Sequence, residues 1–267
     1  MIKQSGLIEI MSKEKAAEFV EKLDLLNESW VSRPQKGINT QNTFGGVSYL
    51  DTDPKQYSEE YTKLNPILLE NFSELYEIII NKLTPLVGEC RLAEELAYPG
   101  FQILGLKEKD PGVTSLIPGI GYNTELHIDW VSYEHKEYWG KFNNVEEDLL
   151  TVTVCLETHK NGSGLIFWDN QATIDSSSNY SNRVKDNASL NLKKLKMMRM
   201  YPFNKDKVDE LDMEYPTIAE YFPGSMFYVI GNPWHQIAPA VDAMSNERRI
   251  TLQAHALKCD GVWRLHF

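Results

Sequence analysis

The spacing of the apolar residues changes near residue 97 of this chain. In the segments 13–26 and 66–83, apolar side chains recur every three or four residues, as on one face of a helix. After residue 97 they fall into short runs bounded by Gly, Pro and Asn, and the run at 149–156 is rich in β-branched residues. The pattern therefore predicts a mixed α+β chain with a mainly β core and N-terminal helices packed on one outer face.

The β core should form one domain together with the helices that precede it. We expect core strands at 97–106, 149–156, 165–168, 226–230 and 248–257. The strands on either side of the turn-forming residues 161–164 are predicted to pair as a hairpin. The polar stretch 169–221 is expected to be an insertion. We thus predict a single domain over 1–267, in which 1–96 form a helical flank with an early strand and 97–267 form the core.

A candidate metal site centres on His127-x-Asp129, within the segment 121–130. Successive side chains of a strand point to opposite faces, so His127 and Asp129 would project together. A third ligand is expected from His235, although His135 remains a weaker alternative. Two histidines and one carboxylate on one face of an iron leave three positions open for substrates.

A candidate anion site lies fourteen residues after His235, at Arg249-x-Thr251. Arg249 and Thr251 would share one face of a strand whose other positions are mostly apolar. An arginine that points into a core is costly unless it pairs with an anion, and a guanidinium suits a carboxylate. Arg248 is the alternative, because a register shift of one residue would exchange the faces of the two arginines.

The combination of His127-x-Asp129, then His235, then Arg249-x-Thr251 resembles the Fe(II)/2-oxoglutarate-dependent dioxygenases. Residues 162–168 are similar to the Gly-Gly-x-Leu strand of that family, and residues 223–229 resemble the turn and strand before the distal histidine. The resemblance covers roughly residues 100–257. It implies a double-stranded β-helix, also called a jelly roll, which agrees with helices early in the chain and short strands late.

The resemblance also implies roles for single residues. Fe(II) would be held by His127, Asp129 and His235, while 2-oxoglutarate would be anchored by Arg249 with help from Thr251. Further contacts are expected from Gln102 to the cosubstrate or substrate, and from Glu125, Trp130 and Trp168 to the substrate. Related halogenases carry Gly or Ala where Asp129 stands, so we expect hydroxylation rather than halogenation, with desaturation or cyclisation left open.

The implied reaction consumes 2-oxoglutarate and O2 and releases succinate and CO2. We expect the substrate to be a small metabolite, such as a free amino acid or a natural-product intermediate. A protein or peptide side-chain hydroxylase and a non-catalytic, cupin-like metal-binding barrel are the alternatives. The oligomeric state, monomer or homodimer, stays open.

Composition bears on partners and location. The net charge of −11 argues against a nucleic-acid partner, which would call for a basic face. No apolar run reaches the ~18 residues of a membrane span. The three cysteines are few, widely spaced and odd in number, so we expect reduced thiols and a cytoplasmic protein.

Overall fold

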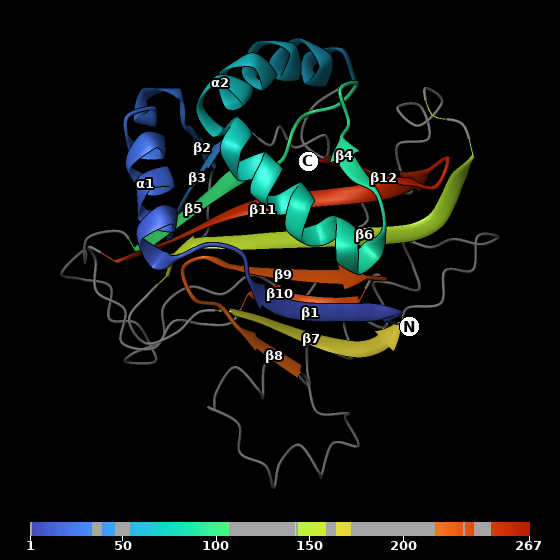
Figure 1. Ribbon diagram of the computed structural model, residues 1–267. Coiled ribbons are helices and arrows are strands. Elements are labelled where there is room, and N and C mark those ends of the chain that lie inside the picture. Colours follow the sequence, from blue (N-terminus) through green and yellow to red (C-terminus); the bar gives the residue numbers. More distant parts are fainter. Residues whose placement is uncertain are drawn as a thin grey trace, which may run out of the picture.

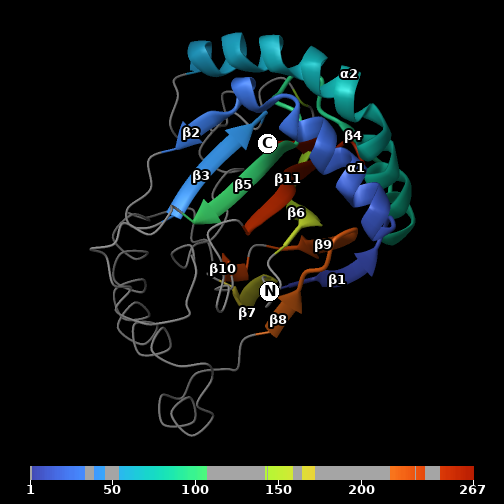
Figure 2. The ribbon, with the colours of Figure 1, turned by 90° about the vertical axis from the view of Figure 1, so that its left-hand side faces the viewer.

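The computed structural model describes residues 2–33, 39–45, 54–106, 142, 144–158, 164–171, 217–231, 233–237 and 247–267. Within these ranges the chain forms a nine-stranded sheet, a three-stranded sheet and two α-helices. Figure 1 shows the two helices over one side of the larger sheet and the smaller sheet on the opposite side. The turned view in Figure 2 shows the same three layers.

The helices are α1 (Lys13–Asp24) and α2 (Pro54–Val87), with a short 3₁₀ turn η1 (Asn27–Ser29) between them. The larger sheet contains β1 (Gln4–Glu9), β2 (Val31–Arg33), β3 (Asn39–Phe44), β4 (Cys90–Leu92), β5 (Gly100–Leu106), β6 (Val145–Glu157), β9 (Ser225–Ile230), β11 (Arg248–Cys259) and β12 (Val262–His266). Seven of these strands run in the order β1-β9-β6-β11-β5-β3-β2, and β12 pairs with β11 and β4. The smaller sheet is β10 (Pro233–Ile237), β7 (Gly164–Gln171) and β8 (Thr217–Glu220), in that order. Among the described strands, every ladder is antiparallel except that between β12 and β4.

Helix α1 begins where the sequence predicts it, because the hydroxyl of Ser12 accepts a hydrogen bond from the amide of Lys15. Helix α2 begins at Pro54 rather than at Pro66, so the expected start was wrong. The apolar spacing in fact extends into this first part of the helix through Tyr57, Tyr61 and Leu64, which pack in one buried cluster, so the prediction started the helix too late. The helix bends at Phe72, whose φ of −129° is not helical.

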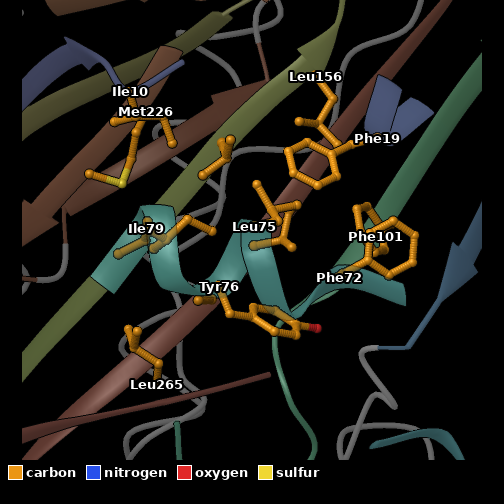
Figure 3. Close-up of a cluster of buried hydrophobic side chains, with 14 of the residues drawn as sticks. Ile10, Phe19, Phe72, Leu75, Tyr76, Ile79, Phe101, Leu156, Met226 and Leu265 are labelled. Atoms are coloured by element: carbon orange, nitrogen blue, oxygen red, sulfur yellow. The ribbon is translucent and has the colours of Figure 1, made fainter. Parts of the chain in front are cut away.

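The core between the helices and the larger sheet is mainly apolar. Figure 3 shows side chains of α2, including Leu75 and Ile79, against residues of β5, β6 and β9. On β11, Ile250, Leu252 and Ala254 are fully buried on this side of the sheet. Residues of a strand alternate between faces, so Arg249 and Thr251 project to the opposite side.

The opposite side of the larger sheet packs against the smaller sheet. The rings of Phe167 on β7 and Phe227 on β9 have centroids 5.3 Å apart, and Leu104 on β5 contacts Ile237 on β10. An interior therefore lies between the two sheets, separate from the core under the helices.

The predicted hairpin of β6 and β7 was wrong, because the two strands belong to different sheets. Strand β6 pairs with β9 and β11, whereas β7 pairs with β8 and β10. Both edges of β6 are thus occupied by strands distant in sequence. The expected insertion at 169–221 includes sheet residues at both ends, since β7 continues to Gln171 and β8 ends at Glu220; residues 172–216 lie outside the described residues.

Some short strands were not predicted from the sequence. The polar stretch 30–43 contains β2 and most of β3, and residues 262–266 near the C-terminus form β12. Short strands near the sheet edges lack the apolar alternation that identifies a half-buried strand. None of the helices in the described ranges combines the length and apolar character needed to cross a membrane.

Candidate cosubstrate and metal site

Arg249 is buried in the interior between the two sheets. It lies on β11, which is flanked by β5 and β6, and it exposes 1% of its surface. Among the described residues, none of its three guanidinium nitrogens has a hydrogen-bond partner. A buried cation without an acceptor is costly, so this arrangement calls for an anion that the described residues do not supply.

Two polar side chains lie beside Arg249 on the same face of the larger sheet. Thr251 is fully buried, and its hydroxyl has no partner among the described residues. Across the ladder, Thr251 pairs with Gln102 on β5 and with Cys155 on β6. Directly paired residues project to one face, so a guanidinium, a hydroxyl and the buried amide of Gln102 line one wall.

The nearest described groups do not neutralise the charge of Arg249. Burial raises the pKa of the Cys155 thiol to about 12, against the attraction of the guanidinium, so this thiol is neutral near pH 7. Burial lowers the pKa of Arg249, but a guanidinium remains protonated in proteins. The ring of Tyr221, with its centroid 5.4 Å from Cζ of Arg249, offers its negative face but no formal charge.

Arg248, the neighbouring residue, is engaged on the helix side of the sheet. Its Nη1 and Nη2 donate to the carboxylate of Asp24 on α1 at 2.8 and 2.6 Å. Its Nε lies 3.0 Å from a carboxylate oxygen of Glu157 on β6. Arg248 is thus partly exposed and is held by two carboxylates. Of the two arginines, Arg249 is the one whose donors face the interior.

His235 reaches the interior from the smaller sheet. It lies on β10, and it is buried. It shares a strand face with Ile237, which contacts Leu104 of the larger sheet. His235 therefore projects toward the wall that carries Arg249.

The ring of His235 has a defined orientation. Its Nδ1 lies 3.0 Å from the carbonyl oxygen of Pro233. Since a carbonyl only accepts, we assign the proton to Nδ1, and the neutral ring then carries its lone pair on Nε2. A backbone carbonyl that fixes the tautomer in this way is a common partner of metal-binding histidines.

Several predicted site residues lie outside the described residues. These are His127, Asp129, Glu125 and Trp130, while Trp168 lies on β7 but its side chain is not described. No group of three possible metal ligands occurs among the described residues. The structure thus brings together Arg249, Thr251 and Gln102 and orients His235 toward them, and the proposed iron ligands stay a prediction.

Sequence reasoning missed Tyr221 and Cys155 as neighbours of the arginine. Tyr221 lies two residues before Pro223, at the start of a predictable turn, yet its distance from Arg249 depends on how β9 pairs with β6. Cys155 could have been noticed, because the strand 149–156 was predicted and alternation along a strand determines the face to which each side chain points. The partner strand of β6 was not predictable from spacing.

No protein-family model and no curated protein sequence matches the chain. Among solved structures, it is similar to an N-substituted L-amino acid dioxygenase from Burkholderia ambifaria AMMD, with a TM-score of 0.52 and 12% identity over 98% of this chain and 86% of that one. A structure of such a dioxygenase in complex with alpha-KG gives a TM-score of 0.52 and 12% identity over 99% and 86% of the two chains. The alpha-ketoglutarate-dependent epimerase SnoN from nogalamycin biosynthesis gives 0.45 and 12% over 94% and 76%, too low a score to support a shared fold. At 12% identity, the likeness to the dioxygenase shows a common fold.

Proposed function

We propose that the protein is an Fe(II)/2-oxoglutarate-dependent oxygenase that hydroxylates an unactivated C–H bond of a small metabolite. The observation that carries this proposal is the buried guanidinium of Arg249, which has no acceptor among the described residues. Its charge needs an anionic ligand able to enter the interior between the sheets. The dioxygenase that shares the fold binds alpha-KG, which is 2-oxoglutarate, and a dicarboxylate of that kind fits the requirement.

The residues around Arg249 suit the distal carboxylate of 2-oxoglutarate. The guanidinium can donate two parallel N–H···O bonds to one carboxylate, and such charge-assisted pairs are strong and directional. The hydroxyl of Thr251, two residues along the same strand face, can donate a further bond. We assign Gln102 a supporting contact, because it is buried and pairs with Thr251 across the ladder.

The metal would be held by His127, Asp129 and His235, the last through Nε2. The tautomer assigned to His235 supports this role, since it leaves the lone pair on that atom. When bound together, iron and 2-oxoglutarate would supply O2 activation coupled to oxidative decarboxylation. In the overall reaction, 2-oxoglutarate, O2 and the substrate R–H give succinate, CO2 and R–OH.

The apolar lining of the interior would strengthen the pairing of Arg249 with its ligand. Phe167, Tyr221 and Phe227 belong to one buried cluster at this wall. Such side chains exclude water, and ionic attraction grows as the local dielectric falls. The protein's own contribution is thus to hold the dicarboxylate in a dry, oriented position.

The strand arrangement supports a double-stranded β-helix as the finer description of the fold. Two antiparallel sheets face each other, and consecutive strands such as β6 and β7 alternate between them. We keep a single domain over 1–267, in which the predicted flank 1–96 also contributes β1, β2, β3 and β4 to the larger sheet. A free amino acid or a natural-product intermediate is the proposed substrate class, with Glu125, Trp130 and Trp168 as proposed contacts.

The first experiment is an anaerobic titration of the Fe(II)-loaded protein with 2-oxoglutarate. A weak visible charge-transfer band should grow and saturate as the cosubstrate chelates iron. If iron binds but no band appears, the protein is a metal-binding barrel of another kind. The rate of succinate release is then measured with candidate metabolites and with peptides. Only members of the substrate class should increase this rate.

A further inference from the structure

Tyr221 is held by a tightly bonded turn between β8 and β9. Within the turn, the amide of Ser225 donates to the carbonyl of Phe222 at 2.9 Å, and the amide of Phe222 donates to the Ser225 hydroxyl at 3.1 Å. Gly224 adopts a φ of +90°, where a Cβ atom would lie 2.2 Å from the carbonyl oxygen of Met11. The turn therefore has little freedom to move, and Tyr221 has little freedom with it.

The same turn is bound to the strand beside the anion site. The amide of Gly224 donates to the carbonyl of Cys155 at 2.8 Å, and Cys155 pairs with Thr251. This docking brings the buried ring of Tyr221 to Arg249, with Cζ of the arginine over the ring at 5.4 Å from its centroid. The rings of Phe227 and Tyr221 also pack together, with centroids 6.3 Å apart.

The face of an aromatic ring can stabilise a buried guanidinium without occupying the hydrogen-bond donors of that guanidinium. A carboxylate from the protein would neutralise Arg249 but would also occupy the N–H groups that a ligand needs. The negative face of an aromatic ring attracts the guanidinium and leaves those N–H groups available. Within the described chain, the three guanidinium nitrogens indeed have no acceptor.

We propose that Tyr221 is a positioning residue for 2-oxoglutarate, which acts by holding the guanidinium of Arg249 in place for the distal carboxylate. This inference rests on the proposed function. Removal of the ring would let the guanidinium shift and would admit water beside it, and both effects weaken the ion pair. The tyrosine hydroxyl has no part in the inference, so phenylalanine should replace tyrosine.

The test compares Tyr221→Leu, Tyr221→Phe and a control variant by the same anaerobic titration. Tyr228→Leu is the matched control, because Tyr228 is a buried ring on β9 that packs on the helix side of the sheet. Tyr221→Leu should raise the dissociation constant of 2-oxoglutarate about tenfold, the effect of a partly desolvated cation–π contact. Tyr221→Phe and Tyr228→Leu should leave it within about twofold. If the leucine variant does not fold, Tyr221→Met fills similar space without an aromatic face.

A second ligand separates positioning from a general loss of structure. 2-Oxobutyrate keeps the 2-oxo acid that chelates iron but lacks the distal carboxylate. Its affinity should be the same in wild type and Tyr221→Leu, whereas the affinity for 2-oxoglutarate falls. Unchanged affinity for 2-oxoglutarate, equal losses for both ligands, or an equal loss in Tyr221→Phe would each overturn the inference. Failure of the wild-type protein to bind 2-oxoglutarate would instead overturn the proposed function.

Discussion

Arg248 and Arg249 are consecutive residues of β11 whose guanidinium groups lie on opposite sides of the larger sheet in opposite electrostatic settings. Arg248 donates to the carboxylates of Asp24 and Glu157, whereas Arg249 has no acceptor among the described residues. One position along the strand therefore separates an arginine that links α1 to the sheet from an arginine whose hydrogen-bond donors remain unused among the described residues. A substitution of Arg248 is therefore the control for the same substitution of Arg249.

Arg249→Lys should weaken 2-oxoglutarate binding by about 1–3 kcal/mol, because lysine keeps the charge but loses the two-pronged donor geometry. The dissociation constant from the anaerobic titration gives the value. Arg248→Lys should leave the constant unchanged. If Arg248→Lys weakened 2-oxoglutarate binding more than Arg249→Lys did, the carboxylate would be bound by Arg248 and not by Arg249.

Asp24→Asn should lower the free energy of unfolding by about 0.5–1 kcal/mol, since the carboxylate and Arg248 are both partly exposed and the pair is screened by solvent. Urea denaturation at low and high salt measures this change, and the difference from wild type should shrink in high salt. Binding of 2-oxoglutarate should not change. A variant that folds normally but loses cosubstrate affinity would contradict this separation of roles.

Gly224→Ala should destabilise the protein more than Gly88→Ala. Both glycines have a positive φ, +90° and +102°, which costs a residue with a side chain about 1–2 kcal/mol. A Cβ atom added at Gly224 would also clash with the carbonyl of Met11, whereas a Cβ atom added at Gly88 would have no neighbour within 4 Å among the described residues. The difference between the two unfolding free energies measures the crowding. Equal losses would mean that the turn adjusts without resistance.

His266 should make the protein less stable as the pH falls below its ordinary pKa. Burial lowers the pKa of His266 to about 3 from 6.5; its hydrogen bond to the Arg264 carbonyl opposes this and nearby His255 adds to it. Between these pH values the unfolded chain binds one more proton than the folded chain. The free energy of unfolding therefore falls with falling pH, by at most about 1.4 kcal/mol per unit.

His266→Asn tests this dependence, because asparagine can keep a donor toward the Arg264 carbonyl without a titrating ring. Denaturation at pH 7 and pH 5 should show a smaller loss of stability in the variant than in wild type. An identical loss in both proteins would assign the acid sensitivity to other groups.

The sequence predicted those parts of the structure that depend on local alternation. On β11, Ile250 and Leu252 alternate with Arg249 and Thr251, so a single strand assignment predicted both the apolar face and the polar one. The helix predicted over 13–26 depends on the same kind of local spacing, and its observed cap at Ser12 also forms within three residues.

The parts that failed depend on contacts between distant residues. Whether β7 turns back beside β6 or crosses to the other sheet is decided by β9 and β11, which occupy both edges of β6. No strand was predicted around His235, yet β10 begins at Pro233, because a proline is tolerated as the first residue of a strand. The position of Tyr221 follows from the docking of its turn on Cys155, which no local pattern records.

Strand β11, which carries Arg249, pairs with β5, β6 and β12, so it has ladders on both edges along most of its length. Its amide hydrogens can exchange with solvent only after these ladders open, which makes it part of the most slowly exchanging unit of the protein. Because Arg249 lies in that unit, its position should not be lost before the rest of the fold unfolds. On heating, any ligand affinity that depends on Arg249 should therefore persist until the larger sheet itself unfolds.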